Sequence, residues 1–143
     1  MNLSMTKKKK VLLAEDDADD RDFFTYFLKD RDDLVLLPPV EDGLQILKFL
    51  NAITDPKELP DLILLDQNMP KMNGRETLKQ LKLMSAYAHI PVFIYSTYAE
   101  KNMMAACVNS GAVMVSQKPT NRDGYNLMMD NFLKSIHHQV FLK

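Results

Sequence analysis

Four short apolar runs of the sequence are each followed by acidic, amide, hydroxyl or amine side chains. In chain order these side chains are Glu15, Asp16, Asp66, Asn68, Ser96 and Lys118. Carboxylates gathered in one place repel one another and need a cation, and an all-oxygen set without histidine or cysteine favours Mg²⁺. A carboxylate beside a divalent ion, an ammonium and a hydroxyl suits phosphoryl transfer onto that carboxylate, because the transfer needs little besides positioning and charge neutralisation.

Each of these residues alone also has an ordinary structural interpretation. The acids from Glu15 onward could cap a helix, Asp66 could lie in a turn, and Lys118 could be a surface residue before a proline. Their joint occurrence at four successive strand ends is harder to assign to chance. We therefore interpret these residues as parts of one functional site.

Five apolar runs alternate with amphipathic segments and must position this site. The runs are Val11–Ala14, Leu34–Leu37, Leu62–Leu65, Val92–Tyr95 and Val113–Val115. Most lack polar alternation, as expected of strands covered on both faces of a parallel sheet. Pro38 and Pro39 make the second run an edge strand. Right-handed crossovers then favour an α/β, flavodoxin-like fold: five parallel strands in the order 2-1-3-4-5, with five helices on both faces.

This topology brings the polar residues together. The first and third strands are neighbours, and sites in open parallel sheets form at the carboxyl ends of the strands, beside the switch in strand order. Glu15, Asp16 and Asp66 are therefore expected in one crevice, flanked by Ser96 and Lys118.

Polar residues and one glycine mark the predicted helix ends. Asp17, Asp42 and Asn73 are expected to cap the first three helices, the last two in capping boxes. The fourth helix is expected to end at Gly111. The apolar face of the second helix is expected to consist of Leu44, Leu47 and Leu50. Residues Asp30–Asp33 are expected to form an ordinary solvated turn.

The composition fits one globular domain of 143 residues, with 46% hydrophobic residues and 18 basic against 19 acidic side chains. Cys107 is the single cysteine, which excludes an intrachain disulfide and a cysteine-rich zinc site. No apolar run approaches the roughly 20 residues that span a bilayer. We therefore expect a cytoplasmic protein that does not insert into membranes.

Residues 1–8 are predicted to form a disordered basic tail. The lysines from Lys7 to Lys10 lack interleaved aromatic residues. Such a run is more typical of a solubilising tail than of a nucleic-acid site, so no direct DNA binding is expected.

Four motifs carry a family resemblance: residues 11–17 (Val-Leu-Leu-Ala-Glu-Asp-Asp), Pro60–Gly74, Ile90–Ser96 and Gly111–Pro119. In type, order and spacing they resemble the receiver domain of two-component response regulators. The resemblance implies a receiver domain over residues 9–143. The stretch 68–76 is similar to small stand-alone regulators, of the chemotaxis type and of the type paired with phytochrome kinases.

The resemblance implies a role for each acid. Asp66 would accept the phosphoryl group and, with Asp16, bind Mg²⁺ or Mn²⁺ directly. Asn68 would offer its main-chain carbonyl to the metal, and Glu15 would act through water.

The same resemblance implies roles for the remaining polar residues. Lys118 would pair with the phosphoryl group, the hydroxyl of Ser96 would turn toward it, and the side chain of Asn68 would face the attacking water during dephosphorylation. The family also usually makes the bond between Lys118 and Pro119 cis.

Two positions depart from the family pattern. Val115 stands where the family usually has an inward-swinging Tyr or Phe, so this chain lacks the aromatic residue of that switch. Tyr98 lies at a position that tunes dephosphorylation, and its bulk is expected to hinder water and prolong the life of the phosphoryl-aspartate.

The resemblance implies a phosphoacceptor switch, with no enzymatic activity beyond self-catalysed transfer and autodephosphorylation. A histidine kinase or histidine phosphotransfer protein would donate the phosphoryl group. The fourth helix, fifth strand and fifth helix would present a surface to a downstream protein or to a second copy in a homodimer.

Three other functions share parts of this pattern. A flavodoxin-like flavin binder has the same topology, but acids such as Glu15 and Asp16 would repel the flavin phosphate. A haloacid-dehalogenase-type phosphatase normally has a second aspartate two residues after its nucleophile, where this chain has Asn68. A docking module without phosphorylation is disfavoured because the acid, hydroxyl and lysine set is complete.

Overall fold

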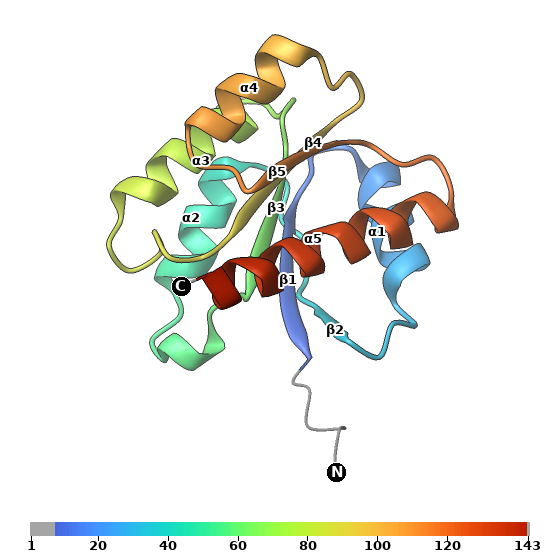
Figure 1. The fold of residues 1–143 in the computed structure, drawn as a ribbon. Helices are drawn as coiled ribbons and strands as arrows, with labels where there is room; N and C mark the ends of the chain where they lie inside the picture. The colour runs from blue at the N-terminus through green and yellow to red at the C-terminus, as the bar shows by residue number, and fades with distance from the viewer. Residues whose placement is uncertain (1–7, 143) are drawn as a thin grey trace.

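A computed structural model describes residues 8–142, so most of the predicted tail, residues 1–7, lies outside the described residues (Figure 1). The strands are β1 (Lys9–Ala14), β2 (Leu34–Leu36), β3 (Leu62–Asp66), β4 (Val92–Ser96) and β5 (Met114–Gln117). The helices are α1 (Ala18–Leu28), α2 (Gly43–Asn51), α3 (Gly74–Leu83), α4 (Lys101–Asn109) and α5 (Arg122–Leu142), with a short 3-10 helix, η2, at Pro56–Glu58.

The strands form one parallel sheet in the order β2-β1-β3-β4-β5, which confirms the predicted fold. Helices α2, α3 and α4 cover one face, and α1 and α5 cover the other (Figure 1). In register, Leu13 pairs with Leu64 and Leu65 pairs with Ile94. All five strands therefore end at the same edge of the sheet.

Side chains of the central strands alternate between two cores. Leu12 and Ile63 pack with α2, α3 and α4, whereas Leu13 and Leu64 pack with α1 and α5. All four side chains are at most 1% exposed. Burial of each such side chain contributes about 1.5–3 kcal/mol. The two cores fix the central strands, and with them the positions of the residues at their carboxyl ends.

The chain rejoins the sheet after the two prolines that end β2. The amide of Val40 donates to the carbonyl of Leu13 at 2.9 Å, and the amide of Glu15 donates to the carbonyl of Val40 at 2.9 Å. The prolines interrupt pairing because they lack an N–H group, but the residue that follows them restores it. These bonds hold the backbone of Glu15 where it leaves β1.

The helix ends largely follow the predictions. Asp17 caps α1, Asn73 forms a full capping box with α3, and Gly111 follows α4 with a φ of 117°. Asp42 caps α2, but the side chain of Gln45 accepts from the amide of Glu41 at 2.8 Å, so the predicted reciprocal box is wrong.

Two predicted environments are wrong. Leu44 is 51% exposed and Ile46 is buried, because the face of α2 that meets the core runs through Gly43, Ile46 and Leu50; of the other expected residues, Leu50 is buried and Leu47 is partly buried. The acidic turn after α1 is not simply solvated. Arg31 bonds both oxygens of Asp33 and lies 2.8 Å from Asp130 of α5, which ties this turn to the helix.

Across residues 8–142, no helix has both the length and the apolar character that a bilayer span requires.

Candidate functional site

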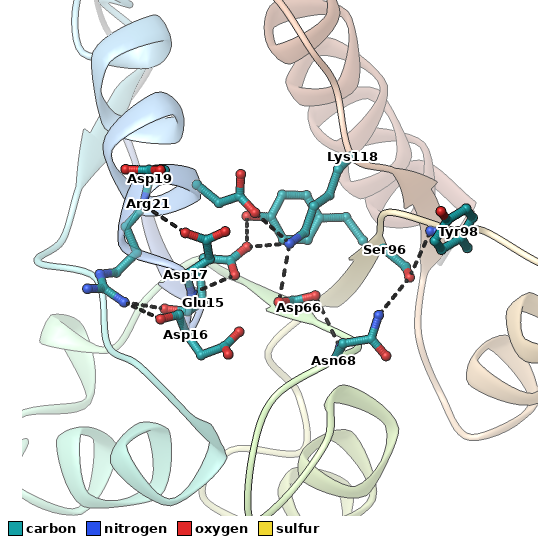
Figure 2. A network of polar contacts seen from close by, with 12 residues as sticks. Glu15, Asp16, Asp17, Asp19, Arg21, Asp66, Asn68, Ser96, Tyr98 and Lys118 are labelled. Atoms are coloured by element: carbon teal, nitrogen blue, oxygen red, sulfur yellow. Dashed lines mark hydrogen bonds and ion pairs between the residues drawn. The ribbon is translucent and has the colours of Figure 1, made fainter.

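The predicted polar residues meet at the carboxyl edge of the sheet (Figure 2). Glu15 follows β1, Asp66 ends β3, Ser96 ends β4 and Lys118 follows β5. Parallel strands project the residues beyond their carboxyl ends to one edge, so side chains far apart in the sequence come within contact distance.

Glu15 is completely buried, and both of its carboxylate oxygens have partners. Oε1 accepts a 2.6 Å hydrogen bond from the hydroxyl of Tyr95 and lies 2.9 Å from the ammonium of Lys118. Oε2 accepts from the amide of Asp17 at 3.1 Å. These contacts satisfy a buried charge that would otherwise be costly.

Lys118 lies at the centre of the acidic cluster (Figure 2). Its Nζ is 2.9 Å from Glu15 Oε1, 2.9 Å from Asp20 Oδ2 and 3.3 Å from Asp66 Oδ2. It also lies 5.1 Å from the centre of the Tyr95 ring. Burial opposes the charge, but the bonds to Asp20 and Glu15 outweigh it and raise the pKa of Lys118 above its ordinary value, so the ammonium stays protonated.

Asp66 is almost completely buried, and its ionisation is disfavoured. Burial, and after it the neighbouring Glu15, raises the pKa of its carboxyl to about 8, although Lys118 and the amide of Asn68 act in the opposite direction. The amide of Asn68 donates to Asp66 Oδ1 at 3.1 Å. A cation placed beside this carboxylate would lower its pKa and favour the charged form.

Glu15, Asp16 and Asp66 form a donor set suited to a divalent cation. One carboxylate oxygen from each lies within 4.8 Å of the other two. Arg21 steadies this segment, because its Nη1 donates to the main-chain oxygens of Glu15 at 2.9 Å and Asp16 at 3.0 Å (Figure 2). Carboxylate oxygens without nitrogen or sulfur ligands fit Mg²⁺ or Mn²⁺.

The hydroxyl of Ser96, at the end of β4, connects Asn68 with the backbone of Tyr98. Its Oγ accepts from Asn68 Nδ2 at 3.5 Å and from the amide of Tyr98 at 3.3 Å (Figure 2). The ring of Tyr98 is 82% exposed, so in this conformation it does not cover Asp66. Val115 packs into the core beneath α4, as one member of an apolar cluster.

Comparison with known proteins decides the family. The model of the response regulator receiver domain matches residues 11–128. This chain belongs to that family. As a receiver domain, it serves two-component signal transduction.

Several proteins are similar to this receiver. The two-component response regulator ARR17 of Arabidopsis thaliana is 33% identical over 124 residues, 81% of this chain and 79% of its own length. A protein-glutamate methylesterase/protein-glutamine glutaminase of Clostridium acetobutylicum is 30% identical over 132 residues, 91% of this chain. The receiver spans only 36% of that enzyme, and 30% of a similar enzyme of Bradyrhizobium diazoefficiens.

Solved structures share its fold. The Mn²⁺-bound form of response regulator Rcp1 is 30% identical with a TM-score of 0.70, covering 83% of this chain and 88% of Rcp1. The phosphorylated cyanobacterial phytochrome response regulator RcpA is 26% identical with a TM-score of 0.73, covering 87% of this chain and 91% of RcpA.

One expectation drawn from the family resemblance is wrong in this receiver. No peptide bond among the described residues is cis, so the bond between Lys118 and Pro119 is trans. Trans is the lower-energy form even before proline. With this geometry the amide of Lys118 still donates to the carbonyl of Ser96 at 2.8 Å, and its ammonium reaches the acids.

Sequence reasoning missed two residues of the receiver site, Asp20 and Tyr95. Asp20 lies in the first turn of α1, directly behind the acids that follow β1, and this position is the signal that could have placed it near the site. Tyr95 lies two residues after Phe93 in β4, which places both rings on one face of the sheet, opposite Ile94. Neither position predicts the contact partner, which is Lys118 for Asp20 and Glu15 for Tyr95.

Proposed function

We propose that this receiver is a phosphoacceptor switch in which Asp66 takes a phosphoryl group from a phosphohistidine. The observation that carries the proposal is the position of Lys118. Its ammonium lies 3.3 Å from Asp66, at the point where three strands bring acids and a hydroxyl together. This arrangement offers a nucleophilic carboxylate with a fixed positive charge beside it.

The acids would hold Mg²⁺, or Mn²⁺ in its place. Asp16 and Asp66 would bind the ion directly, with the main-chain carbonyl of Asn68, and Glu15 would contribute through water. The ion supplies charge neutralisation for the phosphoryl oxygens. The clustered carboxylate oxygens support this assignment, as does the bound Mn²⁺ of the similar Rcp1.

In the proposed transfer, an oxygen of Asp66 attacks phosphorus while the bond from phosphorus to the histidine nitrogen breaks. The nitrogen keeps the electron pair of the broken bond. Lys118 pairs with a phosphoryl oxygen, and the hydroxyl of Ser96 donates a hydrogen bond to another. During hydrolysis the amide of Asn68 would orient the attacking water. No activity beyond this self-catalysed transfer and dephosphorylation is proposed.

The product would act by altering protein contacts. A phosphoryl group adds roughly −1.5 to −2 charges, which attract Lys118 and the hydroxyl of Ser96. Because Val115 replaces the family's aromatic residue, Ser96 and Lys118 would carry the change to the surface of α4, β5 and α5. A downstream protein or a second copy of the receiver would bind there. The donor would be a histidine kinase or a phosphotransfer protein in the cytoplasm.

Acetyl phosphate tests the proposal without a kinase. With Mg²⁺, the intact mass of the protein should rise by one phosphoryl group, and the Asp66→Ala variant should show no gain. The Asp22→Ala variant is the control, because Asp22 is an exposed acid of α1. A wild-type protein that gains no mass, or an Asp66→Ala variant that gains it equally, would overturn the proposal.

A further inference from the structure

Lys118 is held more closely by two other acids than by Asp66. Its Nζ lies 2.9 Å from both Glu15 and Asp20, against 3.3 Å from Asp66. An ammonium has three N–H donors, and three carboxylates surround this one. A phosphoryl oxygen that pairs with Lys118 must therefore displace one of them.

We propose that Asp20 is a positioning residue that competes with the phosphoryl group for Lys118 and so limits how strongly Asp66 holds that group. This inference rests on the function proposed above, in which Lys118 pairs with the phosphoryl oxygens. It adds a residue that none of the four sequence motifs predicts for this role.

Asp20 is the partner that gives way most easily. Its side chain is 25% exposed, whereas those of Glu15 and Asp66 are 0% and 2% exposed. Water can replace Lys118 around a carboxylate at the surface, but not around a buried one. Glu15 is also held by the hydroxyl of Tyr95.

The position of Asp20 on its helix keeps it within reach. Asp17 caps α1, and Asp20 lies in the first turn, close to the positive end of the helix dipole. Asp19 lies in the same turn, with an exposed side chain. The carboxylate of Asp20 bonds the ammonium of Lys118, 98 residues away in the sequence. The two neighbouring acids thus share the helix and the charge, and they differ in contact with Lys118.

Two substitutions separate contact from charge. Asp20→Asn and Asp19→Asn each remove one negative charge from the first turn of α1. We expect Asp20→Asn to free Lys118 and to strengthen binding of beryllium trifluoride, a phosphoryl analogue, by roughly three- to tenfold at saturating Mg²⁺. Asp19→Asn should bind the analogue as the wild type does.

Binding of Mg²⁺ alone gives an opposite readout. A freed Lys118 moves toward Glu15 and Asp66 and competes with the cation, so Asp20→Asn should weaken Mg²⁺ binding several-fold, more than Asp19→Asn does. Damage to the fold would weaken binding of both ions. Tighter binding of the anion together with weaker binding of the cation is therefore the signature of the proposed role.

The experiment measures analogue binding by ¹⁹F NMR and Mg²⁺ binding by calorimetry, with Asp20→Ala as a second variant. Equal effects of Asp19→Asn and Asp20→Asn would overturn the proposal in favour of a general charge effect. Unchanged or weaker analogue binding in both Asp20 variants would also overturn it. If the wild type takes phosphate from acetyl phosphate but the Asp20 variants bind the analogue no more tightly than the wild type does, only this inference is refuted. A wild-type protein that takes none refutes the proposed function itself.

Discussion

The hydroxyl of Tyr95 donates a 2.6 Å hydrogen bond to Oε1 of Glu15, deep in the molecule where neither side chain is exposed. Burial raises the pKa of the Tyr95 hydroxyl far above its ordinary value, and the adjacent Glu15 adds to this effect, so the phenol remains a donor. The same Glu15 oxygen receives Lys118 at 2.9 Å. A neutral donor and a cation thus fix one carboxylate of the proposed metal site.

Replacing Tyr95 by Phe should destabilise the protein by about 1–3 kcal/mol, because Glu15 loses a donor that water does not replace in the core. Urea unfolding measures the change. Tyr87→Phe is the matched control, since Tyr87 donates at 2.6 Å to the neutral Asn51, and it should cost about 1 kcal/mol. An equal or smaller loss for Tyr95→Phe would contradict the importance of its bond to a charged acceptor.

The raised pKa of Asp66 predicts how stability depends on pH. In the fold this pKa is about 8, against an ordinary value of 3.8, so between these values the folded protein binds a proton that the unfolded chain releases. This contribution to stability is complete below pH 3.8 and is lost as the pH rises through 8. Without divalent ions, the free energy of unfolding should decrease from pH 5 to pH 8, and this decrease should be larger in the wild type than in Asp66→Asn. Equal falls in the two proteins would refute the shift.

The same protonation predicts weaker metal binding in acid. The cation must displace the proton of Asp66, so the apparent affinity for Mg²⁺ should rise on the order of tenfold per pH unit below about pH 8 and then level off. Calorimetric titrations at several pH values measure this slope. An affinity that does not vary between pH 6 and pH 8 would count against a protonated Asp66.

Gly74 allows the backbone after β3 to approach α3. A Cβ at this position would lie 2.7 Å from the carbonyl oxygen of Asp66 and 3.0 Å from Cα of Gln67. Gly74→Ala should therefore lower stability by about 1–3 kcal/mol, although alanine favours helices by about 1 kcal/mol. Gly124→Ala, which meets only side-chain atoms of Pro119 and Asn121 within 3.2 Å, should cost less. Thermal unfolding compares the two, and a harmless Gly74→Ala would contradict the close approach.

The expected role of Tyr98 remains a prediction. Its ring is 82% exposed, but its amide contacts Ser96, so a turn of the Ser96 hydroxyl toward a phosphoryl group would move this segment. Tyr98→Ala should shorten the life of the phosphoryl-aspartate several-fold, as followed by the decay of intact mass. Leu83→Ala, at another exposed apolar residue, should leave it unchanged. Decay of the wild-type product within seconds would refute this role.

Much of the fold was predictable because it depends on local patterns. Unbroken apolar runs identify buried parallel strands, and Pro38 and Pro39 identify the edge strand, which together give the observed strand order. Two details depended on the assembled sheet. Val40 returns to pair with β1 after the prolines, and the packing of α2 selects Ile46 over Leu44.

The site was predictable only in part for a similar reason. Motifs at strand ends identify Asp66 and Lys118, because parallel topology brings such ends together. The choice of side-chain partners depends on distances between segments far apart in the chain. Tyr95 is 80 residues from Glu15, and Asp20 is 98 residues from Lys118, so no local spacing pairs them.

The most direct test of the central claim locates the phosphoryl group on the chain. After reaction with acetyl phosphate and Mg²⁺, borohydride reduces an aspartyl phosphate to homoserine, which peptide mass spectrometry maps to one residue. The account predicts homoserine at Asp66 in the wild type, none when Mg²⁺ is chelated before the reaction, and none in Asp66→Ala. Homoserine at Asp16 or Asp20 with Asp66 unmodified would contradict it.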